Sequence, residues 1–269
     1  MPSRPARFIA ATVLAVMLGL SVGGCNTVDG PETTGSIGAA TPSPAPHSEA
    51  EWRASLDILG KRYRENTGDP AAAMAYARAL RATEQYAQAA AVLEQAAMRN
   101  PNDMPLLGAY GRALADTGQY QQALDALGRA HTPDNPDWRI LNAEGAVLDQ
   151  MGRHVEARRH YDTALKIVPN DPSVLSNVGL SYALTKQLKQ AEETLRLAVA
   201  QPTAEPKVRQ NLALIVGLEG RFAEAERIAA ADLPPAEAQA NVQYLHAMID
   251  QQKDWNKPGK RITIPRAGT

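Results

Sequence analysis

The stretch GRHVEARRHYDTALKIVP, residues 152–169, holds two alanines, Ala157 and Ala164, among long polar and aromatic side chains. Their spacing is close to two turns of an α-helix, so both would lie on one face. An alanine at such a position lets the backbone of another helix approach closely. The stretch therefore predicts a helix with one face built for close packing.

Alanine recurs through the chain at intervals of 34 residues. One series is Ala89, Ala123, Ala157, Ala191 and Ala225, and a second is Ala96, Ala130, Ala164 and Ala198. Small residues form a third column at Ala77, Gly111, Gly145, Gly179 and Ala213. Bulky residues form a fourth at Leu80, Leu114, Leu148, Tyr182 and Val216. A fixed period of this length indicates a repeat architecture.

Each period contains two amphipathic segments separated by a turn such as DTGQ, residues 116–119. This pattern resembles the tetratricopeptide repeat. The resemblance implies an all-α fold, a right-handed tetratricopeptide-repeat α-solenoid of about five 34-residue helix-turn-helix repeats with helical caps. The alanines from Ala89 to Ala198 in the first two columns are then the contacts within and between repeats.

The period divides the chain into segments. We expect an N-terminal capping half-repeat at 50–69 and five repeats over 70–239. These repeats cover 70–103, 104–137, 138–171, 172–205 and 206–239. A capping helix is expected at 236–252 and a basic disordered tail at 253–269, although a specific basic arm is the alternative for the tail.

The N-terminus has the features of an export signal. Arg4 and Arg7 precede an apolar run, and the run is followed by Val22-Gly23-Gly24-Cys25. This motif is similar to a bacterial lipobox, so 1–24 is interpreted as a lipoprotein signal peptide and Cys25 as the lipidated residue. Residues 25–49, rich in Gly, Pro, Ser and Thr, would form a disordered tether. An ordinary secretory signal with an incidental cysteine is the alternative.

Asn26 follows the cysteine where Asp would favour retention in the inner membrane. We therefore expect an outer-membrane lipoprotein that faces the periplasm of a Gram-negative bacterium. Two or three acyl chains on Cys25 would make the anchor lasting.

Composition and motifs argue against catalysis. The 28 Lys and Arg nearly balance the 29 Asp and Glu, which gives no sign of a nucleic-acid surface. The single cysteine excludes a disulfide framework, and the five histidines show no metal-ligand spacing. GLSYA, residues 179–183, lacks the final glycine and the preceding strand of a nucleophile elbow. We expect no enzyme, no metal, no small-molecule substrate and no cofactor beyond the lipid on Cys25.

The first helix of each tetratricopeptide repeat commonly lines a concave groove for a peptide. Carrying those positions over gives an N-terminal set that is mainly charged: Arg78, Arg81, Arg112, Asp116, Arg139, Asn142 and Asp149. The C-terminal set is largely apolar: Asn177, Leu180, Leu184, Lys207, Asn211, Leu214 and Leu218. We therefore expect a protein partner with an acidic stretch beside a hydrophobic one. Solvated side chains without a specific ligand are the alternative.

Chaperone-binding relatives hold a C-terminal dicarboxylate with five Lys, Asn and Arg positions. Only Asn177 and Lys207 match that set here, while Asn142, Ala146 and Asn211 occupy the other positions. A free carboxylate would be held weakly by so few cations.

Two segments, 131–185 and 209–249, resemble the TadD lipoproteins of the tight-adherence (Tad/Flp) pilus system. The more specific parts are PDWRIL, residues 136–141, and DLPP, residues 232–235. The resemblance implies a scaffold for pilus assembly or secretion, possible roles being a pilotin or a stabiliser of the secretin. Partners would be the secretin or other Tad components. A periplasmic scaffold for other envelope biogenesis, such as outer-membrane protein assembly, is the alternative.

Overall fold

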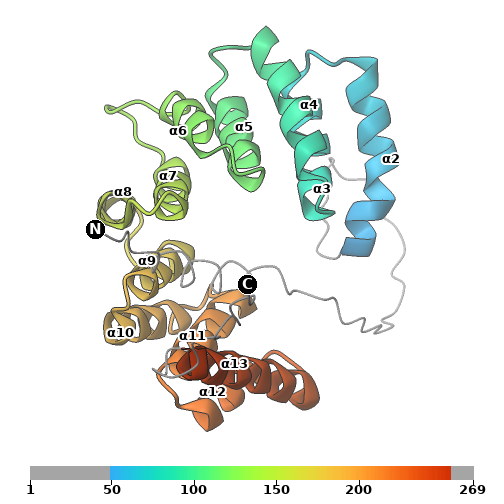
Figure 1. The fold of residues 1–269 in the computed structure, drawn as a ribbon. Coiled ribbons are helices and arrows are strands. Elements are labelled where there is room, and N and C mark those ends of the chain that lie inside the picture. Colours follow the sequence, from blue (N-terminus) through green and yellow to red (C-terminus); the bar gives the residue numbers. More distant parts are fainter. Residues whose placement is uncertain (1–48, 256–269) are drawn as a thin grey trace, which may run out of the picture. The chain divides into compact units, whose positions relative to one another are not determined.

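The computed structural model describes residues 49–255, which form helices joined by short turns (Figure 1). Within this range no strand is present, and one isolated bridge links Thr132 to Asn135. The expected all-α class is confirmed. The expected signal peptide, Cys25 and most of the tether and basic tail lie outside the described residues.

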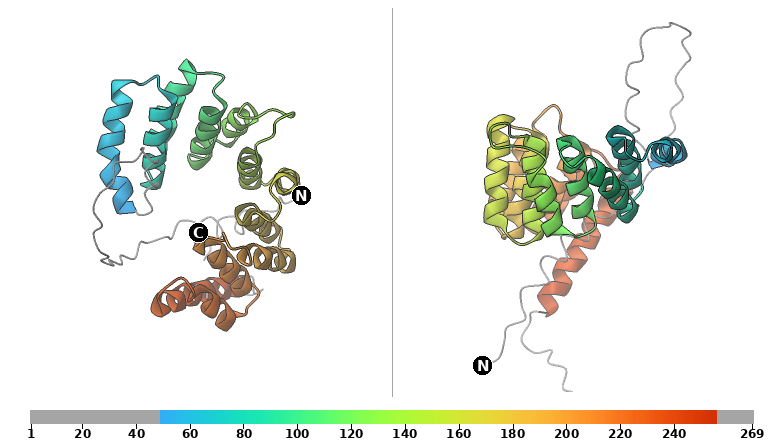
Figure 2. Two further views of the ribbon diagram at one scale, coloured as in Figure 1. Left: turned by 180° about the vertical axis from the view of Figure 1, so that it is seen from behind. Right: turned by 90° about the horizontal axis from the view of Figure 1, so that it is seen from above.

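The chain divides into two compact units, Met1–Met151 and Gly152–Thr269. The first unit contains α2 (Glu49–Glu65), α3 (Pro70–Ala82), α4 (Tyr86–Arg99), α5 (Met104–Asp116), α6 (Tyr120–Gly128) and α7 (Trp138–Gln150). Each helix packs against the next, and α5 also contacts both α3 and α7 (Figure 2). The alternate helices α3, α5 and α7 are therefore neighbours.

The second unit contains α8 (His154–Ile167), α9 (Pro172–Leu184), α10 (Leu188–Val199), α11 (Pro206–Leu218), α12 (Phe222–Ala229) and α13 (Pro235–Trp255). Here α11 contacts both α9 and α13. Helix α13 begins one residue before the expected capping helix and ends three residues after it. The boundary between the units falls in the turn between α7 and α8, inside the third expected repeat.

The small residues of the repeating columns are buried. Every alanine of the first column, from Ala89 to Ala225, is 0% exposed. A Cβ added to Gly111 on α5 would lie 2.6 Å from Cγ of Leu127 on α6. One added to Gly179 on α9 would lie 2.7 Å from Cγ of Leu195 on α10. The paired helices thus approach too closely for any side chain at these two positions.

Aspartates cap the first helices of successive hairpins at the same 34-residue spacing. Their carboxylates accept hydrogen bonds from backbone N–H groups in the first helical turn, at Asp69, Asp103, Asp137 and Asp171. These bonds give a partner to backbone N–H groups that have no acceptor within the first turn of a helix. Glu205 stands at the fifth position and makes no such bond.

The turn inside each hairpin also recurs with the period. A residue with positive φ follows the first helix at Glu84, Gly118, Gly152, Lys186 and Gly220. The next residue's N–H returns to a carbonyl of the helix, as from Gln187 N to Tyr182 O at 2.9 Å. This is the left-handed helix ending that glycine favours, so Glu84 and Lys186 adopt it with steric strain.

Enlarging a small-residue column should destabilise the protein. We expect Ala89→Leu in α4 to lower the free energy of unfolding by about 1 to 3 kcal/mol, because overpacking forces neighbouring groups apart. Ala87→Leu in the same helix, at an exposed position, should change it by less than about 0.5 kcal/mol. Urea unfolding followed by far-UV circular dichroism measures both, and equal effects would contradict the packing argument.

Relieving the strain at Lys186, whose φ is 64°, should stabilise the second unit. We expect Lys186→Gly to raise the free energy of unfolding by about 0.5 to 1 kcal/mol. Lys189→Gly, three residues later inside α10, should instead lower it by about 1 kcal/mol. Thermal and urea unfolding of the two variants provide the comparison; destabilisation by both would show that the turn is not strained.

Candidate partner-binding surfaces

Three neighbouring helices carry the N-terminal set of expected groove residues. Arg78 and Arg81 lie on α3, Arg112 and Asp116 on α5, and the remaining three, Arg139, Asn142 and Asp149, on α7. Because α5 contacts both α3 and α7, residues from the three helices can share one surface.

The structure brings Arg81, Arg112 and Asp116 together. Arg81 Nε donates a hydrogen bond to Asp116 Oδ2, which joins α3 to α5. Burial lowers the pKa of Arg112, and the positive charges of Arg81 and Arg78 lower it further. Asp137 and Asp116 act in the opposite direction. We call Arg78, Arg81 and Arg112, with Asp116 and Asp137, the arginine cluster.

The α7 residues of this set lie in different surroundings. Arg139 is exposed, and its guanidinium stacks on the ring of Trp138, 4.5 Å from the centroid. Asn142 is half-buried, and Asp149 is 8% exposed. Asp149 therefore offers little surface to a partner.

In the second unit the expected residues lie on α9 and α11, which contact each other. Leu180, Leu184, Leu214 and Leu218 are half-buried, and Leu218 packs against the core of the unit. Asn211 Nδ2 donates to Ser176 Oγ at 2.9 Å, a link between the two helices. Lys207 is exposed, and Asn177 is half-buried. The surface of α9 and α11 is thus more apolar than the arginine cluster.

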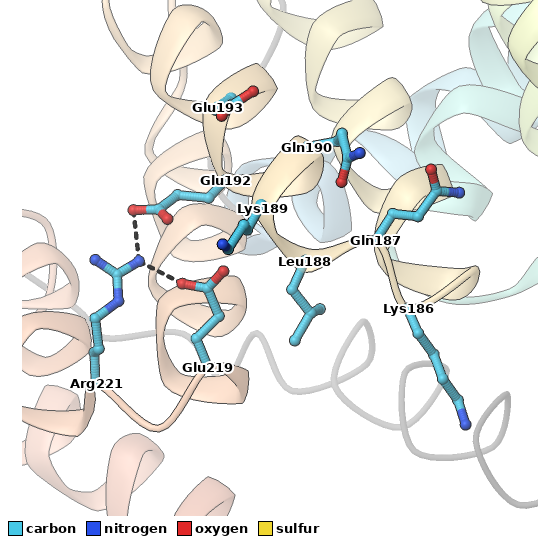
Figure 3. A pocket seen from close by; sticks show the side chains of 9 residues that line it. All are labelled: Lys186, Gln187, Leu188, Lys189, Gln190, Glu192, Glu193, Glu219 and Arg221. Atoms are coloured by element: carbon cyan, nitrogen blue, oxygen red, sulfur yellow. Dashed lines mark hydrogen bonds and ion pairs between the residues drawn. The ribbon is translucent and has the colours of Figure 1, made fainter.

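An open depression of about 810 Å³ lies beside the turn that leads into α10 (Figure 3). On one side Arg221 donates to Glu192 at 2.6 Å and to Glu219 at 2.5 Å. Arg196 joins Glu192 to Glu224 at 2.6 and 2.7 Å. Lys186 extends away from this ion network. The arginines and carboxylates of this ion network pair with one another. The network links α10 to α12 and to the turn that precedes α12. Both of its arginines are already paired, so neither offers a free charge to a ligand.

Sequence reasoning missed two polar features. The ion network joins residues about thirty positions apart, such as Glu192 and Arg221. Similarly, His131 Nε2 lies 3.6 Å from Glu144 Oε2 on α7, where both side chains are largely buried. Neither pair has a local motif that could have indicated it.

The described part of the chain offers no cluster of three or more His, Cys, Asp or Glu side chains suited to a metal ion. Among residues 49–255, no helix combines the length and the hydropathy that crossing a bilayer requires. The expectation that the protein is not an enzyme stays a prediction.

Residues 55–130 match the family model of the anaphase-promoting complex, cyclosome, subunit 3. No curated protein matches the chain at a significant level. The family match covers the first hairpins of the first unit.

Solved structures match over more of the chain. A chain of the APC/C hetero-tetramer Cut9-Hcn1 is 15% identical with a TM-score of 0.61, over 76% of this chain and 40% of that longer one. PilW, a widely conserved type IV pilus biogenesis factor, is 16% identical with a TM-score of 0.60, over 72% and 91%. TTC0263, a thermophilic tetratricopeptide protein of Thermus thermophilus, is 22% identical with a TM-score of 0.58, over 68% and 100%.

These likenesses show the fold alone. The chain has the tetratricopeptide-repeat α-solenoid fold that the 34-residue period predicted. This fold is a scaffold for protein-protein interaction, and its neighbouring first helices present the surfaces described above.

The ion network predicts a pH-dependent contribution to stability. Hydrogen bonds from Arg221, and then from Arg196, hold the pKa of Glu192 below its usual 4.5. As pH falls, the unfolded chain takes up this proton first, so the contribution is full at neutral pH and is lost as pH falls through the folded pKa.

We expect Glu192→Gln to lower the free energy of unfolding by about 1 kcal/mol at neutral pH. The difference from the natural protein should shrink between neutral and acid pH, as the pH falls through the folded pKa of Glu192. Urea unfolding across this range measures it, with Glu193→Gln, an exposed neighbour, as the control. A difference that persists unchanged in acid would exclude the carboxylate as its cause.

Proposed function

We propose that this protein is an outer-membrane lipoprotein of a Gram-negative bacterium that acts as a scaffold in Tad/Flp pilus assembly or secretion. In this role it binds a segment of another protein on the surface formed by the first helices of its repeats. The secretin is the partner we consider first, with the protein as its pilotin or stabiliser.

The observation that carries the proposal is the joint presence of a lipobox and a tetratricopeptide array in one chain. Val22-Gly23-Gly24-Cys25 would supply a membrane anchor, and residues 49–255 supply a protein-binding fold. A tether of about two dozen residues would let the fold search near the membrane and would raise the effective concentration of a partner.

The pilus assignment depends on the resemblance of segments 131–185 and 209–249 to TadD lipoproteins. PilW offers a parallel, because a type IV pilus biogenesis factor has the same fold and this chain spans 91% of its length. The parallel concerns architecture, and the partner of PilW is not carried over to this chain.

Removing the lipidated thiol tests the anchor. We expect Cys25→Ser to leave the outer-membrane fraction and piliation to drop, because the acyl chains would no longer hold the protein at the membrane. Sucrose-gradient fractionation and electron microscopy of pili measure the two effects. The control is Asn26→Asp, which keeps the thiol and should shift the protein to the inner membrane.

If Cys25→Ser still fractionated with the outer membrane while pili formed normally, the anchoring proposal would fail. Photocrosslinking from Arg139 in the native envelope then tests the role itself. Crosslinks to a pilus secretin support it, whereas crosslinks to the outer-membrane protein assembly machinery would support the alternative scaffold.

A further inference from the structure

Arg112 is an unusual arginine for the surface of a repeat protein. It is only partly exposed, and a Cβ added to Gly108 would lie 3.7 Å from its Nη1. The guanidinium of Arg112 therefore lies beside Gly108, one turn earlier on α5, which has no side chain. Within residues 49–255, neither Arg112 nor Arg78 forms a hydrogen bond or ion pair with a carboxylate.

The fold leaves the charge of Arg112 poorly compensated. Asp116 is hydrogen-bonded to Arg81, and Asp137 Oδ1 accepts the N–H of Arg139 at 2.7 Å as the cap of α7. Arg81 and Arg78 lie close enough to repel Arg112. A partly desolvated cation beside like charges is unfavourable, so this position does not serve stability.

We infer that Arg78, Arg81 and Arg112 form a binding site for one carboxylate side chain in an extended segment of a protein partner. The inference rests on the scaffold role proposed above and does not depend on the pilus assignment. A carboxylate there would face planar guanidinium groups that bind it in bidentate geometry. It would also relieve the repulsion among the three arginines.

The charges of the cluster favour a peptide over a polyanion. Three arginines against two aspartates, Asp116 and Asp137, leave one net positive charge. Nucleic acids and anionic membranes are bound by rows of cations that neutralise several phosphates. The flanking aspartates would repel such a chain, while they tolerate a single carboxylate between neutral residues.

The test uses two blocked peptides and the purified full-length chain. One peptide is acetyl-Ala-Leu-Glu-Leu-Ala-amide, which carries one carboxylate between neutral residues, and the other has Gln in place of its acidic residue. Arginine Nε–Hε signals in NMR titrations identify the site. We expect the acidic peptide to shift the signal of Arg112 with roughly millimolar or tighter affinity, and the neutral peptide to bind about tenfold more weakly.

Two substitutions should change the affinity in opposite directions. Arg112→Gln should weaken binding about tenfold without lowering the free energy of unfolding. Asp116→Asn should strengthen binding a few-fold, because it removes a repelling charge and frees Arg81. The control is Arg62→Gln on α2, an exposed arginine outside the cluster, which should change neither quantity.

The inference is overturned if both peptides shift Arg112 equally, if neither shifts it, or if Arg112→Gln destabilises the fold while binding is unchanged. It is also overturned if a twenty-nucleotide oligothymidylate or phosphatidylglycerol vesicles bind the cluster more tightly than the acidic peptide at about 0.15 M salt. The fractionation of Cys25→Ser does not depend on these results, so the two proposals can fail separately.

Discussion

Close contact between helix backbones is the constraint on which the structure depends. Gly111 and Gly179 sit where a methyl group would overlap a leucine of the paired helix, and the alanines opposite them have no exposed surface. Such contacts fix the spacing of each hairpin and of its neighbours. As a result α3, α5 and α7 become neighbours, and side chains that are far apart in sequence meet on one face.

The periodic part of the fold could be predicted because it follows from side-chain size at fixed intervals. Small residues at Ala89 and its counterparts indicate where helices touch, and a 34-residue period that repeats five times indicates stacked hairpins. The capping aspartates and the left-handed turn residues obey the same period. They could have been found in the sequence by the same comparison of columns.

The chemistry of the surface could be predicted only in part. The column positions place Arg112 on the inner side of a first helix, but its partial burial depends on Gly108 one turn earlier and on Arg78 and Arg81 of another helix. Asp149 is a second example: its column position predicts that it lies on the groove surface, but the structure buries it almost completely. The repeat pattern does not specify side-chain conformations. It could therefore not indicate which ion pairs form, such as that of Arg221 with Glu192.

The capping aspartates make the junctions that they occupy chemically equivalent, whereas Glu205 at the fifth makes no capping bond. Asp103 and Asp137 each precede a first helix and bond its opening N–H groups. Excision of the block 104–137 would place Asp103 directly before Trp138, in the position that Asp137 had occupied. An array with such junctions can gain or lose whole hairpins through duplication or deletion without a new joint having to evolve, and its length can change while the capping bonds are kept.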